Sequence, residues 1–398
     1  MKLIERPHYL ERLKGLRGSP DIKIITGIRR SGKSRLMQAF MHYLEETDSQ
    51  ANIIYIDFTR LSFEGLKEYH ALNDYVESHH LVGRNNYLMM DEVQLCKGFE
   101  LTVNSLHASE EYDIYLTGSN AFLLSADLAT LFTGRHIEIA IYPFSFKEYC
   151  DYYAPVHDLQ AAFDRYVVEG GMAGSYSYEN AADKEAYIKD VYDTILTRDL
   201  TEKYHLADTQ VLNHLAEYLM DNVSNTTSPN NVATTLTANQ LPTNHKIVGR
   251  YLNYLCNAFV FYKADRYDIR GRKYLESLNK FYLADTGIRY ALLGLRNMDW
   301  GRIYENIVYL ELRRRGYQAY IGKLYQKEVD FVAMRGGEKL YIQVSDSISD
   351  EQTFLREREP LLKIKDAYPK FIIARTRHEE YDYQGIRILD IAKWLLRD

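Results

Sequence analysis

The first 145 residues alternate short apolar runs with longer stretches in which apolar residues recur every three or four positions. The first pattern is typical of buried strands and the second of amphipathic helices. Five runs have strand length, and they lie in 22–26, 52–58, 86–94, 113–120 and 136–144. Strands that alternate with helices form a mostly parallel sheet, which binds its ligand at the carboxyl ends of the strands. The pattern therefore predicts an α/β domain over residues 1–150.

Beyond residue 150 the apolar spacing becomes mostly helical, and we predict a helical lid or connector over 151–206. A turn-rich break at 225–231 is followed by a helical stretch and then by strand-like residues. A helix followed by a hairpin is the order of a recognition helix and its wing, so residues 207–285 are predicted to form a winged-helix-like domain. The remaining residues, 286–398, again combine helices with apolar strands and predict a second α/β domain.

The sequence GIRRSGKS follows the first predicted strand and leads directly into a predicted helix. Its Gly27, Gly32, Lys33 and Ser34 match the phosphate-binding pattern GxxxxGK[ST]. In that pattern glycines turn backbone N–H groups onto the phosphates, the lysine reaches the β- and γ-phosphate oxygens, and the serine hydroxyl binds Mg²⁺. We therefore predict ATP and Mg²⁺ as cofactors. The other residues expected at the nucleotide are Arg29, Arg30, Ser31 and Arg35, with a neighbouring molecule as the alternative contact of the two consecutive arginines.

Two adjacent acids end the third predicted strand. Asp91 occupies the position of a Walker B carboxylate, which holds Mg²⁺, and Glu92 that of the carboxylate that orients the attacking water. The next strand ends in Ser119 and Asn120, which we expect at the γ-phosphate and the attacking water, although a helix cap or a turn would also explain them. The acidic pair, together with an extra strand between the loop and the acids, favours the ASCE-like branch of P-loop proteins, which hydrolyse ATP with a carboxylate.

Arg135 precedes the last strand of the first domain. A cation at this position can stabilise the charge of a phosphoryl group in transfer, as an arginine finger or a γ-phosphate sensor. A surface arginine at the start of a strand explains the residue equally well. If Arg135 acts on phosphate, it acts either in its own subunit or in the next subunit of a homo-oligomer. The predicted catalytic set is Lys33, Glu92, Asn120 and Arg135.

The chain of 398 residues has a formal net charge of -6, so a polyanionic partner would have to meet a local basic patch. Residues 243–280 carry eight basic and three acidic side chains, a net charge of +5. This reversal suits the phosphate backbone of DNA and equally suits a docking module for a protein partner. The candidate DNA-contacting residues are Lys246, Arg250, Arg266, Arg270, Arg272 and Lys273. Because no apolar run is long enough to span a bilayer, we expect no membrane partner and a cytoplasmic location.

Several stretches, in this order along the chain, resemble one family. They are GIRRSGKS, YLMMDEVQ, YLTGSN, TGRHIEIAIYPFSFKEY and VVEGGMAGSY, then FYLADTGIRYALLG, residues 304–333 and LYIQVSDSI. The chain is similar over nearly its whole length to bacterial and archaeal AAA+-type ATPases that carry a C-terminal domain of unknown function. This resemblance implies an AAA+-type P-loop ATPase core, then a winged helix, then an α/β fold like that of the PD-(D/E)xK nucleases.

The C-terminal segment has part of the chemistry of such a nuclease, which holds a divalent ion with two acids and positions water with a lysine. Glu305 and Asp330 are available as acids, but Gln343 and Ser345 stand where the second strand acid and the lysine are expected. A relocated lysine would come from a neighbouring element, and the candidates near in sequence are Lys323, Lys327 and Lys339. We expect a degenerate site without nuclease activity.

The expected function is that of an Mg²⁺-dependent ATPase whose nucleotide state controls DNA- or protein-binding modules in the C-terminal part. One alternative is a slow, nucleotide-gated (STAND-like) switch that recruits a partner. Another is an ATP-coupled nuclease. Steady-state turnover with and without DNA distinguishes the first two, and metal-dependent DNA cleavage would identify the third.

Overall fold

The computed structural model describes residues 4–119, 132, 134–206, 209–296 and 298–397. The chain forms two compact units. The N-terminal unit consists of Leu3–Ile141 and the short segment Asn257–Phe259, and the C-terminal unit consists of Tyr142–Cys256 and Val260–Asp398. The continuous part of the N-terminal unit ends at Ile141, whereas we predicted a first domain over residues 1–150.

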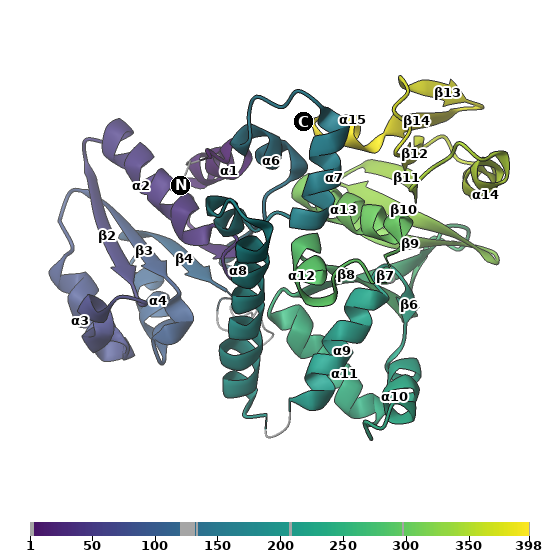
Figure 1. Ribbon diagram of the computed structural model, residues 1–398. Coiled ribbons are helices and arrows are strands. Elements are labelled where there is room, and N and C mark those ends of the chain that lie inside the picture. The colour runs from purple at the N-terminus through teal and green to yellow at the C-terminus, as the bar shows by residue number, and fades with distance from the viewer. Residues whose placement is uncertain (1–3, 120–131, 133, 207–208, 297, 398) are drawn as a thin grey trace. The chain divides into compact units, whose positions relative to one another are not determined.

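A five-stranded parallel sheet forms the centre of the N-terminal unit (Figure 1). Its strands are β1 (Ile22–Thr26), β2 (Ala51–Asp57), β3 (Asn85–Asp91), β4 (Tyr112–Gly118) and β5 (His136–Ala140). They lie side by side in the order β2-β3-β4-β1-β5, so β4 separates β1 from β3. The predicted parallel sheet is confirmed, and the carboxyl ends of β1, β3 and β4 meet at one edge.

Helices cover both faces of this sheet. They are α1 (Pro7–Leu16), α2 (Lys33–Thr47), α3 (Tyr69–Ser78) and α4 (Phe99–Ala108), with short 3-10 turns at Leu61–Leu66 and Val93–Leu95. Buried residues of α1 and α2, such as Leu13 and Phe40, pack on one face of the strands. Those of α3 and α4, such as Leu72 and Val103, pack on the other. Because side chains of a strand alternate between faces, burial on both faces explains why the strands read as continuous apolar runs.

The C-terminal unit begins with helices α6 (Phe146–Tyr152), α7 (Leu159–Glu169) and α8 (Ala181–Thr194), which continues as a π-helix over Ile195–Glu202. Next come α9 (Gln210–Asp221), β6 (Thr226–Thr227), α10 (Pro229–Ala238), α11 (His245–Asn257), β7 (Phe261–Asp268) and β8 (Lys273–Leu283). The rest contains α12 (Thr286–Leu293), α13 (Trp300–Arg314), β9 (Gln318–Leu324), β10 (Lys327–Arg335), β11 (Glu338–Ser345), α14 (Glu351–Leu362), β12 (Lys370–Ala374), β13 (Tyr381–Tyr383), β14 (Ile386–Asp390) and α15 (Ile391–Leu395).

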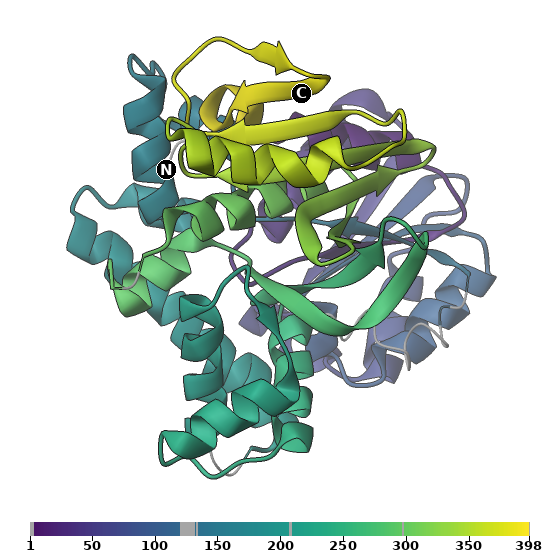
Figure 2. The ribbon, with the colours of Figure 1, turned by 90° about the vertical axis from the view of Figure 1, so that its right-hand side faces the viewer.

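One nine-stranded sheet joins the two C-terminal segments that the sequence predicted as separate domains. Its order is β13-β14-β12-β11-β10-β9-β7-β8-β6. Strands β9, β10 and β11 form an antiparallel meander, and β12 and β14 continue parallel to β11. Figure 2 shows the helix of residues 351–362, in yellow-green, lying along these strands, and its contacts are with β10, β11, β12 and β14. Because β7 pairs with β9, the sheet continues across the boundary predicted between residues 285 and 286.

The predicted connector, 151–206, belongs to the C-terminal unit. Hydrogen bonds to Asp285, the N-cap of α12, connect this segment to the rest of the unit. The carboxylate of Asp285 accepts from the backbone N–H of Gly171 at 2.5 Å and from that of Gly287 at 2.9 Å. The backbone N–H of Phe144 donates to the carbonyl oxygen of Gly171 at 2.8 Å. A Cβ atom on Gly171 would lie 2.2 Å from the carbonyl oxygen of Phe144, so this close approach requires glycine.

The predicted helix and hairpin are present as α11, β7 and β8. Helix α10 was not predicted, because it begins at Pro229 inside the stretch assigned as a turn-rich break. Ser228 caps that helix by accepting from the backbone N–H of Asn231, and proline at the first helical position needs no N–H partner. The turn-forming residues therefore mark a helix start. No helix in the described part of the chain has both the length and the apolar character of a membrane span.

Candidate nucleotide site

The loop between β1 and α2 has a shape that depends on glycine. Gly27 has φ of 146° and Gly32 has φ of 100°. A Cβ atom on Gly27 would lie 2.1 Å from the carbonyl oxygen of Ile141. Gly32 immediately precedes α2, so the loop leads into a helix amino terminus, where backbone N–H groups lack intrahelical acceptors and favour an anion.

Lys33 and Arg6 donate hydrogen bonds to carbonyl oxygens of this loop. Lys33 is 4% exposed, and its Nζ donates to the carbonyl oxygens of Gly27 at 2.9 Å and Ile28 at 3.1 Å. Arg6, which immediately precedes α1, donates from Nη1 to the carbonyl oxygen of Ser31 at 2.9 Å. Since Arg6 is 25 residues from Ser31 in sequence, the loop motif could not reveal it.

Asp91, the last residue of β3, is 2% exposed. Its Oδ1 accepts a short hydrogen bond from the hydroxyl group of Thr117 on β4, and its Oδ2 lies 3.4 Å from the hydroxyl oxygen of Tyr55 on β2. Burial raises the pKa of Asp91, whereas hydrogen bonds with Ser34 and Thr117 lower it. The two residues predicted to hold Mg²⁺, Ser34 and Asp91, are therefore in hydrogen-bond contact.

Glu92 follows with a left-handed backbone, φ 54°. Its backbone N–H donates to Oγ1 of Thr117 at 2.9 Å, and its Oε2 accepts from the hydroxyl of Ser119 at 3.0 Å and from Nε2 of Gln94 at 2.5 Å. Ser119 thus contacts the acid that we assigned to water orientation. Thr117, which contacts both Asp91 and Glu92, was not predicted as a site residue. Its signal in the sequence was a polar residue inside an apolar strand.

The oxygen donors at this edge of the sheet suit Mg²⁺. Hard cations prefer oxygen ligands, and Mg²⁺ is usually bound through one or two protein oxygens together with phosphate oxygens. The hydroxyl of Ser34 and the carboxylate of Asp91 are such donors, and the nearby carboxylates of Glu92 and Asp57 add negative charge. The described residues contain no group of three or more His, Cys, Asp or Glu side chains that could hold a metal, so phosphate would have to complete the coordination.

The other residues predicted at the nucleotide differ in how far they are exposed. Arg29 is half-buried and Arg30 exposed, with φ 67° at Arg30. The exposed Arg35 donates from Nη1 to Oε1 of Gln38 at 3.2 Å, so its side chain lies along α2 and its backbone is the part nearest the loop. Asn120 lies outside the described residues.

Arg135 lies at the edge of the sheet opposite to the phosphate loop. It is exposed and precedes β5, and its carbonyl oxygen accepts from the backbone N–H of Ile22 at the start of β1. The five residues of β5 run parallel to β1, so roughly 16 Å of strand separate Arg135 from the carboxyl edge. This distance argues against a contact with the nucleotide of its own subunit. A contact with the nucleotide of a neighbouring subunit, or a surface arginine without a role at phosphate, remains as the explanation.

Comparisons with known proteins agree with this geometry. Residues 19–150 match the model of an AAA domain, and residues 160–299 match that of a domain of unknown function (DUF8612). An uncharacterized protein of Haemophilus influenzae is 36% identical over 401 residues, covering 99% of both chains. The chain belongs to the same family, a family of AAA-domain proteins. The predicted AAA-type ATPase core with a following domain of unknown function is confirmed at this level.

Other relatives of this AAA family are more distant. The uncharacterized protein MJ1544 of Methanocaldococcus jannaschii is 27% identical over 354 residues, covering 85% of this chain and 77% of that protein. Among solved structures, the Walker-type ATPase PABY2304 of Pyrococcus abyssi has a TM-score of 0.45 and 16% identity, covering 73% of this chain and 96% of that chain. This structural similarity is too low to assign a family. The assignment to a family of AAA-domain proteins rests on the matching sequence model and on the relative from Haemophilus influenzae.

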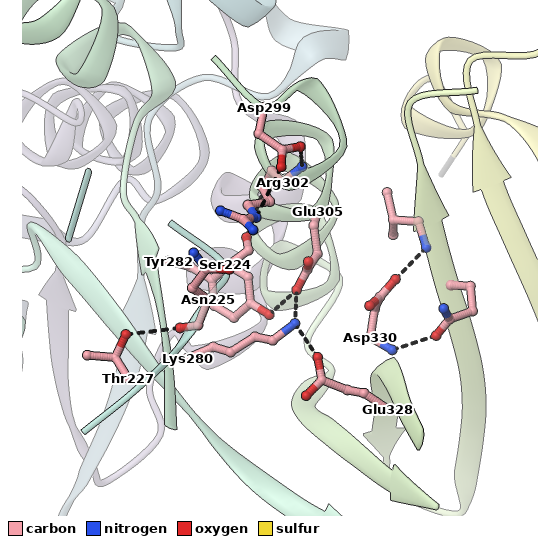
Figure 3. A network of polar contacts seen from close by, with 12 residues as sticks. Ser224, Asn225, Thr227, Lys280, Tyr282, Asp299, Arg302, Glu305, Glu328 and Asp330 are labelled. Carbon is pink, nitrogen blue, oxygen red and sulfur yellow. Dashed lines mark hydrogen bonds and ion pairs between the residues drawn. The ribbon is translucent and has the colours of Figure 1, made fainter. Parts of the chain in front are cut away.

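A second set of polar residues lies in the C-terminal unit and includes Glu305 and Asp330, two of the nuclease-like positions (Figure 3). The backbone N–H of Asp330 donates to Oε1 of Gln343 at 2.8 Å, and its Oδ2 accepts from the backbone N–H of Val344 at 2.7 Å. Oε1 of Glu305 accepts from Nζ of Lys280 at 2.9 Å. The structure therefore brings Glu305, Asp330 and Gln343 into one neighbourhood.

The lysine that pairs with Glu305 is not one of those that we considered, although Lys323 lies opposite Glu328 in the pairing of β9 with β10. Lys327 pairs with Glu359 on α14, and Nζ of Lys339 lies 4.8 Å from the centroid of the Tyr368 ring. The lysine that is present, Lys280 on β8, was counted in the sequence analysis among the cations of the basic segment. Ser345 is 4% exposed and donates to the carbonyl oxygen of Ser347 at 2.9 Å.

The candidate DNA-contacting residues lie on α11 and on the β7–β8 hairpin. Lys246, Arg250, Arg270, Arg272 and Lys273 are exposed, whereas Arg266 is half-buried in β7. Arg270 lies 5.0 Å from the centroid of the Tyr325 ring. Because Lys280 is buried and paired, the cations available to a polyanion are fewer than the sequence count implied.

Proposed function

We propose that this protein binds and hydrolyses ATP in an Mg²⁺-dependent reaction, and that its nucleotide state controls binding modules in the C-terminal unit. The observation that carries the proposal is the meeting of Lys33, Asp91 and Glu92 at one edge of a parallel sheet, with Thr117 bonded to both acids. Phosphate loop, metal ligand and water-orienting carboxylate are the parts required for phosphoryl transfer to water.

Each residue has a distinct role in this proposal. Lys33 leaves the loop carbonyls for the β- and γ-phosphates, while backbone N–H groups at the start of α2 hold the phosphate oxygens. Ser34 and Asp91 hold Mg²⁺, which neutralises the charge that develops on the phosphoryl oxygens. Glu92 accepts a hydrogen bond from the attacking water and directs it at phosphorus. Ser119 and Gln94 restrict the carboxylate of Glu92 to one orientation through their hydrogen bonds.

The proposal predicts ATP turnover that requires Mg²⁺. The purified full-length protein should release phosphate from ATP when Mg²⁺ is present, and this release should stop when EDTA removes the metal. Without Mg²⁺ the negative charge that develops on the phosphoryl oxygens is no longer neutralised by a metal ion. Equal turnover in EDTA would contradict the assigned roles of Ser34 and Asp91. Nucleotide binding without turnover would instead favour the slow nucleotide-gated switch.

We further propose that α9, β6, α10, α11, β7 and β8 form a winged helix. The order of helix, strand, two helices and hairpin, with β6 antiparallel to β8, supports this assignment. In that arrangement α11 is the recognition helix and β7–β8 is the wing. The exposed cations Lys246 and Arg250 on α11, and Arg270, Arg272 and Lys273 at the hairpin, favour duplex DNA as the partner.

If these five cations contact phosphates, DNA affinity should fall roughly 500-fold between 50 and 200 mM salt, because each contact releases a condensed counterion. Replacing Arg270 and Arg272 by glutamate should weaken binding to all sequences alike. Fluorescence anisotropy with labelled duplexes measures both effects. Lys263→Ala is the control, because Lys263 is in the same hairpin but pairs with Asp265 at 3.0 Å. Binding that does not respond to salt would contradict the proposal, and absence of binding would favour a protein partner.

The segment α13, β9, β10, β11, α14 and β12 has the αβββαβ order of the PD-(D/E)xK nuclease core, and we propose that it is a relative of that fold without cleavage activity. Gln343 supports this view. Its Nε2 donates to Oε2 of Glu357 at 2.8 Å while its Oε1 accepts from Asp330, so the amide serves as a structural link. A glutamate at this position would put a second carboxylate against Glu357, which is 7% exposed.

A further inference from the structure

One face of the nine-stranded sheet carries α14 over part of its width. Helix α14 contacts β10, β11, β12 and β14, and its Leu361 packs in one cluster with Val332 and Tyr341 of the sheet. Tyr320 of β9 is paired in register with Val332, so its ring lies on the same face. Figure 2 shows α14, in yellow-green, along these strands and the green hairpin of β7 and β8 below it.

Three tyrosines form a group of neighbouring rings on this face. Tyr267 of β7 is paired directly with Tyr274 of β8, and their ring centroids are 5.5 Å apart. The ring of Tyr274 lies 5.1 Å from that of Tyr320. Tyr267 is buried, Tyr320 is half-buried and Tyr274 is 61% exposed, so the group extends from the core to the surface. Burial and a hydrogen bond with Tyr274 raise the pKa of Tyr320 to about 12, which keeps this ring uncharged at neutral pH.

Lys339 of β11 places a cation beside this group. Its Nζ lies 5.5 Å from the centroid of the Tyr267 ring and 4.8 Å from that of Tyr368, a 42% exposed residue of the loop before β12. Burial raises the pKa of Tyr267, and the exposed Arg272 in the turn of the β7–β8 hairpin opposes this shift as a second nearby cation. We call Tyr267, Tyr274, Tyr320, Tyr368 and Lys339 the tyrosine platform.

The acids near the tyrosine platform already have partners. Asp366 accepts from the hydroxyl of Tyr341 at 2.5 Å, and Asp265 pairs with Lys263 at 3.0 Å. Asp268 accepts from backbone N–H groups of the hairpin turn. These acids reduce the net positive charge of the region, so a ligand has to gain more from the rings than from the charges.

We propose that the tyrosine platform binds single-stranded DNA, with bases stacked on the exposed rings and phosphates at Lys339 and Arg272. Aromatic rings beside cations suit this ligand, because every base has a face that can stack and every nucleotide carries a phosphate. A duplex fits less well, since it offers base edges in its grooves while its base faces are stacked on one another. A protein partner also fits less well, because lysine is depleted in protein interfaces.

The inference goes beyond the proposed duplex contacts of α11 and of the hairpin turn. Only the choice of DNA over RNA rests on that proposed function. Arg272 is common to both surfaces, so the variants that test the tyrosine platform leave it unchanged. All five residues of the platform belong to the C-terminal unit, which makes the inference independent of ATP hydrolysis.

The test measures binding of a fluorescent oligothymidine of about 20 nucleotides to nucleotide-free full-length protein in EDTA, by anisotropy. Tyr274→Ala should weaken binding on the order of 10-fold, whereas Tyr274→Phe, which keeps the ring, should bind as the wild type does. Lys339→Ala should weaken binding and reduce the salt slope by about 0.7, as expected for one lost phosphate contact to a single strand. A strand of the same length built from abasic nucleotides should bind the wild type at least about 10-fold more weakly.

Tyr381→Ala is the matched control. Tyr381 is 42% exposed on β13, at the far end of the strand order from β7 and β8, and its loss should leave single-strand binding unchanged. Tyr368→Ala changes a loop residue on the other side of Lys339 and should weaken binding as Tyr274→Ala does, which covers the case in which Tyr274→Ala does not fold. Thermal unfolding shows which variants are folded.

Duplex binding measured in the same series separates this inference from the proposed winged helix. Tyr274→Ala should bind a duplex as the wild type does, and an equal loss for duplex and single strand would overturn the inference. Absence of single-strand binding, unchanged binding by both Tyr274→Ala and Tyr368→Ala, or equal affinity for the abasic strand would also overturn it. Tighter binding of an oligouridine of the same length would overturn the choice of DNA.

Discussion

Glu92→Gln should lower kcat for ATP hydrolysis by about 100-fold or more while leaving the affinity for ATP unchanged. Glutamine has almost the same shape and can still accept from the hydroxyl of Ser119, which is 3.0 Å from Oε2 in the wild type. It lacks the negative charge that orients the attacking water and accepts its proton. The contacts assigned to Mg²⁺ and phosphate, made by Ser34, Asp91 and Lys33, remain.

Steady-state phosphate release and binding of a fluorescent ATP analogue measure the two effects separately. Glu110→Gln is the matched control. Glu110 is an exposed acid in the turn before β4, at the amino end of that strand, whereas Ser119 and Glu92 lie at its carboxyl end. It should hydrolyse ATP at the wild-type rate. Unchanged turnover by Glu92→Gln would remove Glu92 from the mechanism and leave another group to position the water.

Lys33→Ala should weaken ATP binding by about 100-fold and thereby abolish turnover at ordinary ATP concentrations. Hydrogen bonds between charged groups are the strong ones, and this ammonium is assigned to the β- and γ-phosphate oxygens. The substitution also removes the two hydrogen bonds that Nζ donates to the carbonyl oxygens of Gly27 and Ile28, so the loop loses internal support. Isothermal titration with ATP and Mg²⁺ measures the loss.

Arg35→Ala provides the control for charge near the loop. The guanidinium of Arg35 is exposed and bonded to Gln38, and the substitution keeps the backbone N–H that we assign to the nucleotide. Its affinity for ATP should stay close to that of the wild type, and thermal unfolding should show both variants folded. A Lys33→Ala variant that binds ATP normally would exclude the phosphate loop as the nucleotide site.

The candidate nucleotide site could largely be predicted from sequence because its main parts are local. Gly27, Gly32, Lys33 and Ser34 occupy one continuous loop, and Asp91 and Glu92 are adjacent. In a parallel sheet every strand ends at the same edge, so the strand pattern alone implied that the loop and the acids would meet. The order β2-β3-β4-β1-β5 then explains why Ser119, at the end of β4, lies beside Glu92.

Other residues of that site depend on contacts between distant parts of the chain. Arg6 reaches the loop from before α1, and Thr117 bridges Asp91 and Glu92 from the neighbouring strand. Neither stands in a recognisable motif. Arg135 illustrates the converse case: its position before a strand suggested a role at phosphate, but the direction of β5 places it at the opposite edge of the sheet.

In the C-terminal unit, the pairing of distant strands and the surroundings of Lys280 could not be predicted from the sequence. The sequence by itself determined the AAA-type core, the positions of most helices and strands, and the absence of a complete PD-(D/E)xK motif, because periodicity and motifs are properties of neighbouring residues. Only the tertiary structure decided that β7 pairs with β9 and that Lys280 lies among Glu305, Glu328 and Asp330. Strand pairing joins residues that are far apart along the chain, and the charge balance of a buried cluster depends on which side chains that pairing brings together.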